Sequence, residues 1–78
     1  MRYTDQADKH RVPRTSTWYV VMTAHSEPAI TNWGEKGLLY TGMDDRGVEL
    51  EVITVPRHGT ETVVHSMPTA YRHNQKRN

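Results

Sequence analysis

Three stretches of alternating apolar and polar residues mark the C-terminal half of the chain. Residues 38–43, 48–55 and 61–67 are rich in β-branched and aliphatic side chains, a composition typical of strands. The two connections, residues 44–47 and 57–60, each contain a glycine among polar residues, which predicts tight turns. Short connections join antiparallel neighbours, so we predict a three-stranded meander with residues 48–55 in its centre.

The central strand divides its side chains between the two faces of that sheet. Val48, Leu50 and Val52 alternate with Glu49 and Glu51, and successive side chains of a strand point to opposite faces. We therefore predict that the three aliphatic residues pack against helices and that the two carboxylates point the other way.

A second helix is predicted over residues 13–25, following a first one over residues 4–10. In the second, Trp18, Val21 and Met22 recur at helical spacing, which predicts an apolar stripe that faces the sheet. Its residues are also good strand formers around position 19, so a strand at 17–21 stays open as an alternative.

The first helix would be capped by Thr4 or Asp5 and broken before Pro13. Residues 29–36 are predicted to be a loop or a short irregular strand. The expected fold is α+β, with two N-terminal helices packed on one face of a small antiparallel sheet.

Composition predicts one small domain over residues 1–78. Only 35% of the residues are hydrophobic and the mean hydropathy is -0.82, so the core is small and a partner or a second copy could add stability. The absence of cysteine excludes disulfides and thiolate metal sites. No apolar run reaches the roughly 20 residues of a membrane span, and no signal-peptide core begins the chain. We expect a cytoplasmic protein.

Charge is distributed unevenly although the net charge is only +1. Basic residues outnumber acidic ones in residues 1–14 and stand alone in residues 71–78, whereas acidic residues dominate residues 15–70. If the two basic ends meet in the fold, they form a face that attracts phosphate. The alternative is that these charges are solvated and only aid solubility. Residues 71–78 are expected to be a basic tail, either flexible or a short helix.

Histidine and arginine are the side chains that metal-independent RNA cleavage requires. Imidazole can exchange protons near neutral pH, and guanidinium can hold the charge of the phosphate. We select His65, His10 and Arg72 as candidate catalytic residues, with a buried structural histidine as the alternative for His65. Further candidate RNA contacts are Lys9, Arg11, Arg14, Tyr71, His73, Lys76 and Arg77.

No cofactor or metal is expected. The spacing of His58 and His65 does not suggest a metal site, and the pair Asp44 and Asp45 is explained by turn chemistry. Trp33 lies in a polar segment, where its indole could be either an exposed binding surface or a cover for the core.

Residues 9–12, 40–52 and 64–69 carry a resemblance to a known family. Together with the expected order of elements, they resemble the RelE superfamily of small bacterial toxins, and more closely the BrnT-like proteins of actinobacteria and their phages. Those proteins often have glycine at the position of Arg11 and alanine at the position of Ser66. The resemblance implies a RelE-like fold, endoribonuclease activity and a partner antitoxin.

Three functional hypotheses follow. The first is an RNA-cleaving toxin of a toxin–antitoxin system, with RNA and a cognate antitoxin as partners. The alternative is a non-catalytic inhibitor, for example phage-encoded, that binds a host protein or RNA. The third is an inactive scaffold that forms a homodimer through an exposed strand edge. None of the three requires a membrane.

Overall fold

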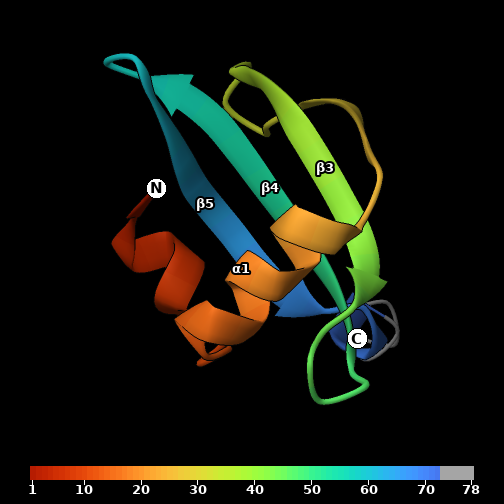
Figure 1. The fold of residues 1–78 in the computed structure, drawn as a ribbon. Helices are drawn as coiled ribbons and strands as arrows, with labels where there is room; N and C mark the ends of the chain where they lie inside the picture. The colour runs from red at the N-terminus through yellow and green to blue at the C-terminus, as the bar shows by residue number, and fades with distance from the viewer. Residues whose placement is uncertain (73–78) are drawn as a thin grey trace.

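One mixed sheet forms the centre of the computed structural model, which describes residues 1–72 (Figure 1). Within these residues the sheet has five strands in the order β1-β5-β4-β3-β2. Strand β1 runs parallel to β5, and every other neighbouring pair is antiparallel. The strands are β1 (Arg2–Tyr3), β2 (Ser26–Ile30), β3 (Lys36–Met43), β4 (Glu49–Arg57) and β5 (Thr60–Pro68).

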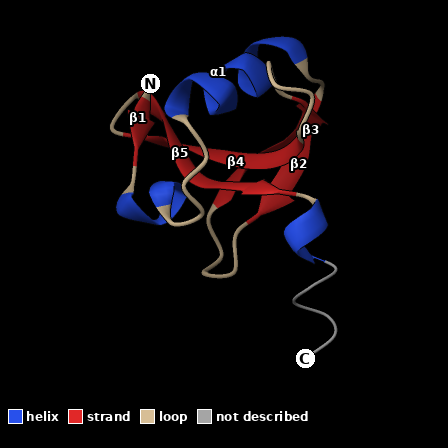
Figure 2. Cartoon of the chain, turned by 90° about the horizontal axis from the view of Figure 1, so that it is seen from below, coloured by secondary structure: helices blue, strands red, loops and turns tan. Residues whose placement is uncertain are grey.

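One α-helix, α1 (Arg14–Thr23), lies across one side of the sheet (Figure 2). It is preceded by a single 3-10 turn, η1 (Asp5–Asp8). The Thr4 hydroxyl caps this turn by accepting a hydrogen bond from the Ala7 N–H at 3.2 Å. A second helical turn begins at Ala70 and is described as far as Arg72.

The predicted arrangement of two helices on a three-stranded sheet is wrong. Residues 4–10 form only η1, because Arg11 adopts a left-handed conformation (φ 58) and Pro13 follows, so the turn cannot extend. Two strands that the pattern does not reveal, β1 and β2, add an edge on each side of the meander. Strand β2 contains Pro28, which an edge strand tolerates because its outer side needs no hydrogen-bond donor. The meander of β3, β4 and β5 is present.

The core lies between α1 and the sheet. Leu50 and Val52 of β4, Val63 of β5 and Val20 of α1 are fully buried there. Val48 does not join them as predicted, because β4 begins only at Glu49 and leaves Val48 37% exposed in the turn.

Two of the three residues of the apolar stripe predicted on α1 face solvent, whereas Val21 is partly buried and packs against the core. Trp18 is 46% and Met22 63% exposed, whereas Ser16, Thr17 and Val20 form the buried side of the helix. The Thr17 and Ser66 hydroxyls share a buried hydrogen bond of 2.7 Å between α1 and β5. Small hydrogen-bonded side chains let α1 lie close to the sheet, so helical periodicity identified the helix and misassigned its inner face.

Asp44 stabilises the turn between β3 and β4. Its buried Oδ1 accepts hydrogen bonds from the N–H groups of Arg46 (2.8 Å) and Val48 (2.9 Å). Burial raises the pKa of this carboxyl, but these backbone bonds and the Arg46 guanidinium outweigh burial and lower it. Asp44 therefore has the structural role that turn chemistry predicts.

Candidate functional site

A buried carboxylate lies on the side of the sheet opposite α1. Strand alternation directs Glu51 away from Leu50 and Val52, and Glu51 is only 4% exposed. Arg72 donates to both carboxylate oxygens, from Nε to Oε1 at 2.9 Å and from Nη2 to Oε2 at 2.6 Å. His65 contacts the same Oε2 through Nε2 at 2.9 Å. Three charge-assisted contacts compensate for the burial of this one charge.

Strand register brings Glu51 and His65 together. Glu51 pairs with Met67 across β4 and β5, so His65 is its diagonal neighbour on the same face, a separation that long side chains can span. The next pair after Ile53 and His65 skips Val64, which is therefore the extra residue of a β-bulge.

The ionisation of Glu51 determines which nitrogen of His65 carries hydrogen. Burial raises the pKa of Glu51, but the hydrogen bonds from Arg72 and His65 and the positive charge of Arg72 outweigh burial. The pKa of Glu51 therefore lies below its ordinary value. An ionised carboxylate can only accept hydrogen bonds. Nε2 of His65 must therefore donate to Glu51, which leaves Nδ1 of the neutral ring as the atom that can accept a proton.

A second imidazole lies beside the first. The ring centroids of His10 and His65 are 6.0 Å apart in an edge-to-face arrangement, and the Tyr71 ring packs on His10 at 5.8 Å. Burial lowers the pKa of His10, and positive charge on His65 and Lys9 lowers it further, against a smaller opposite effect of Glu51. His10 is therefore mainly neutral at neutral pH.

These groups border a cavity of about 420 Å³, called the His65 cavity below. Its lining comes from Gln6, Lys9 and His10, residues 30–33, Glu51 and Ile53 of β4, Val64, His65 and Met67 of β5, and Arg72. Segments from both halves of the sequence therefore meet at one place, with two imidazoles and two basic side chains around it.

Four of the residues selected from the sequence line the His65 cavity. They are His65, His10, Arg72 and Lys9, and Tyr71 is linked to them through its contact with the His10 ring.

Arg14 and Arg11 are not brought to the cavity lining. Arg14 forms an ion pair of 2.6 Å with Asp8 and lies over the Tyr3 ring at 4.6 Å. Arg11 is exposed and has a φ of 58°, a conformation that favours glycine. The remaining selected residues, His73, Lys76 and Arg77, lie outside the described residues.

Sequence reasoning missed Glu51 as a site residue. The alternation of residues 48–52 places its side chain away from the core, but nothing local shows that Arg72 and His65 bury it. The segment 30–33 was also missed as cavity lining. For Trp33, the structure favours the exposed alternative, since the residue is 59% exposed.

Within residues 1–72, no group of three or more histidine and acidic side chains is arranged to hold a metal ion. In the same residues no helix has the length and hydropathy of a membrane span.

Comparison with known proteins identifies no relative. No protein-family model matches the sequence, no curated protein matches it, and no solved structure matches the chain. The resemblance to BrnT-like toxins therefore stays a prediction that rests on the three sequence segments.

Proposed function

We propose that the protein is an endoribonuclease that cleaves RNA by metal-independent acid–base chemistry in the His65 cavity. The observation that supports this function is the pair of neighbouring imidazoles, one of them held by a buried carboxylate, at a cavity with two cations. General acid–base cleavage of a phosphodiester needs a base, an acid and cationic charge near the phosphate.

His65 suits the role of base. Its Nδ1 accepts the proton of the ribose 2′-hydroxyl while the 2′-oxygen bonds to phosphorus. The Glu51 carboxylate on Nε2 orients the ring and stabilises the imidazolium that forms. His10, in its protonated form, then donates a proton to the departing 5′-oxygen as the bond from phosphorus to that oxygen breaks. Because the pKa of His10 is lowered, the fraction of this protonated form grows as the pH falls below neutral. The products are a 2′,3′-cyclic phosphate on one strand and a 5′-hydroxyl on the other.

Arg72 and Lys9 suit the binding of the phosphate. Arg72 uses Nε and one hydrogen of Nη2 on Glu51, so its Nη1 group and second Nη2 hydrogen remain to donate to a phosphate oxygen. The Arg72 side chain is 58% exposed, which leaves this edge of the guanidinium accessible. Arg72 can therefore hold Glu51 and a phosphate at the same time.

The test is cleavage of a short single-stranded RNA in the presence of a chelator by wild type and by His65→Gln. Glutamine can still donate to Glu51 but cannot act as a base near neutral pH. We expect about a 100-fold or larger loss of rate, and no cleavage of the same sequence with 2′-deoxyribose throughout.

The matched controls are His58→Asn and His25→Gln. Both wild-type residues are exposed histidines that do not line the His65 cavity, and asparagine tolerates the left-handed backbone of His58 (φ 51). Equal rates for wild type and folded His65→Gln, or cleavage of the deoxy strand, would refute the mechanism.

The resemblance to BrnT-like toxins supports a cellular role as the toxin of a toxin–antitoxin system. We expect induced expression of the wild type to arrest growth with fragmentation of cellular RNA, and His65→Gln to remove both effects. Growth arrest with intact RNA that persists in His65→Gln would instead support the non-catalytic inhibitor.

A further inference from the structure

Trp33 is an exposed aromatic residue on a rigid turn. Residues 31–35 are closed by backbone hydrogen bonds from Thr31 N–H to the Glu35 carbonyl and from Gly34 N–H to the Thr31 carbonyl, both 2.9 Å. The buried Thr31 hydroxyl also accepts the Glu35 N–H at 2.9 Å, and Gly34 supplies the positive φ of 89° that the turn needs.

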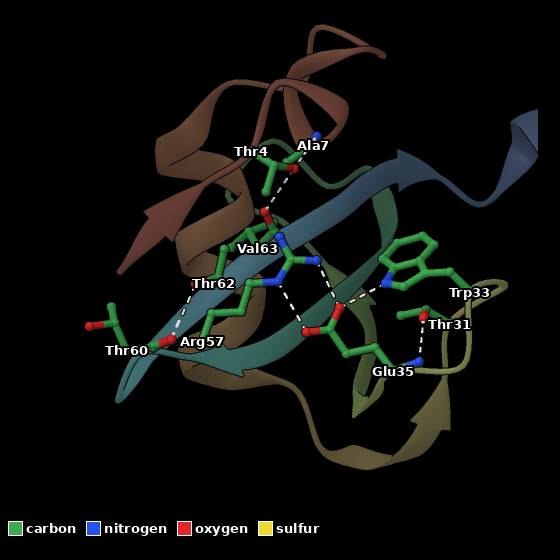
Figure 3. A network of polar contacts seen from close by, with 9 residues as sticks. All are labelled: Thr4, Ala7, Thr31, Trp33, Glu35, Arg57, Thr60, Thr62 and Val63. Atoms are coloured by element: carbon green, nitrogen blue, oxygen red, sulfur yellow. Dashed lines mark hydrogen bonds and ion pairs between the residues drawn. The ribbon is translucent and has the colours of Figure 1, made fainter.

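An ion pair holds the indole in place from its edge. Oε1 of Glu35 accepts hydrogen bonds from Trp33 Nε1 and from Arg57 Nη2, each 2.7 Å long, while Oε2 accepts from Arg57 Nε at 3.0 Å (Figure 3). Arg57 first, and then the indole N–H, lower the pKa of Glu35 to about 2. Glu35 therefore stays ionised, and the contact to the indole persists, throughout the range in which RNA is studied.

This geometry limits what the indole can do for a ligand. Its only polar atom is already bonded to Glu35, yet the residue is 59% exposed. What remains available is a flat apolar ring face, which can stack but cannot donate a hydrogen bond. An exposed indole that served only to cover the core would not need an ion pair to fix its orientation.

The ring lies at the border of the His65 cavity, together with Arg72 and Lys9. An aromatic face beside cations matches the two parts of a nucleotide, because a base stacks on the ring while its phosphate binds the cations. A base inside a duplex already has neighbours on both faces. Away from strand ends, only an unpaired base can offer a face to Trp33.

We propose that Trp33 is a stacking platform for an unpaired base and restricts the His65 cavity to single-stranded RNA. Glu35 and Arg57 are positioning residues that hold the ring. The inference deepens the proposed function by naming its substrate class, but it concerns binding and does not require that the strand be cut.

Tryptophan fluorescence tests the contact directly. The other tryptophan of the chain, Trp18, lies on the exposed side of α1. In the variant Trp18→Phe the tryptophan fluorescence therefore comes from Trp33 alone. The probe is a short 2′-O-methyl RNA, which cannot be cleaved. We expect the single strand to quench Trp33, whereas its duplex and an abasic strand of the same length leave the fluorescence nearly unchanged.

Substitution of the ring then tests its contribution to binding. Trp33→Ala should weaken binding of the single strand about tenfold, and Trp33→Phe should weaken it much less, since phenylalanine can still stack. In the wild-type background Glu35→Gln should also weaken binding. In the Trp33→Phe background it should have little further effect, because phenylalanine has no N–H for Glu35 to hold. A purely structural role of Glu35 would give the same loss in both backgrounds.

The outcomes separate this inference from the proposed function. A Trp33→Ala variant that binds and cleaves single-stranded RNA as the wild type does would overturn the stacking platform, and the proposed nuclease function would be unaffected. Quenching by single strands without cleavage of any RNA would support the platform and remove the nuclease. Equal quenching by single strand, duplex and abasic strand would overturn the platform as well.

Discussion

Removing Arg72 should destabilise the protein more than neutralising its partner Glu51. The Glu51 side chain is only 5% exposed, whereas that of Arg72 is 58% exposed. Arg72→Ala therefore leaves a buried carboxylate with His65 as its remaining partner. In Glu51→Gln the group that loses its ionic partner is the Arg72 guanidinium, which is already accessible to water.

The magnitudes follow from this asymmetry. Breaking a fully buried ion pair by removing one partner costs about 3–5 kcal/mol, but loss of Arg72 also opens Glu51 to solvent, so we expect about 2 kcal/mol for Arg72→Ala. Glu51→Gln should cost about 1 kcal/mol, the value of a typical hydrogen bond. In a domain of this size these losses lower the melting temperature by roughly 10 °C and roughly 5 °C.

The difference should also depend on pH. In the wild type the folded state lowers the pKa of Glu51, so its contribution to stability is present above the unfolded-state pKa of about 4.3 and is lost as pH falls below it. Without Arg72, only His65 opposes the burial that raises the pKa of Glu51, so we expect the deficit of Arg72→Ala to grow as pH rises through about 4.3.

The assay is urea denaturation followed by circular dichroism at about pH 4 and about pH 7, with the double variant Glu51→Gln/Arg72→Ala as control. The double variant should be more stable than Arg72→Ala alone near neutral pH. A larger loss for Glu51→Gln than for Arg72→Ala, or a deficit of Arg72→Ala that is greater at the lower pH, would refute the reasoning.

Three further predictions concern packing and the pH profile. Gly37→Ala should destabilise by about 2 kcal/mol in thermal melts, because a Cβ there would collide with the backbone of β4; wild-type stability would contradict this. Thr17→Val and Ser66→Ala should each cost about 1–2 kcal/mol by leaving a buried hydroxyl unpaired, and the double variant should cost less than their sum; strict additivity would contradict it. The alkaline limb of kcat/KM for RNA cleavage should lie below pH 6.5, where His10 loses its proton, and Lys9→Gln should move it to higher pH by removing a positive charge. A limb that stays in place would exclude His10 as the acid.

The three central strands could be predicted because their alternation and their turns are local signals. Strands β1 and β2 could not. Strand β1 has only two residues, and β2 contains a proline and no alternation, so both depend on the backbone of a neighbouring strand. The inner face of α1 was misassigned for a similar reason, since Thr17 is buried by its hydrogen bond to Ser66 rather than by its hydropathy.

The candidate site was predicted by residue type and only partly by position. His65, His10 and Arg72 were selected because their side chains suit RNA cleavage, and the structure brings all three to one cavity. Glu51 was missed because its contact with His65 depends on the register of β4 and β5. The sequence did not decide whether Trp33 is exposed, because the orientation of its ring depends on Glu35, and Glu35 is held by Arg57 from a distant part of the sequence.

The shared carboxylate couples stability to chemistry in this protein. Glu51 binds Arg72 and orients His65 through the same oxygen, Oε2, so a variant at either Glu51 or Arg72 changes folding, phosphate binding and the base together. Loss of cleavage in such a variant cannot by itself assign a role. His65→Gln removes the base but keeps a donor for Glu51, so it does not leave the buried carboxylate without that contact. Lys9 forms no ion pair within residues 1–72 that its substitution would break. Kinetic evidence for the mechanism should therefore come from these two positions.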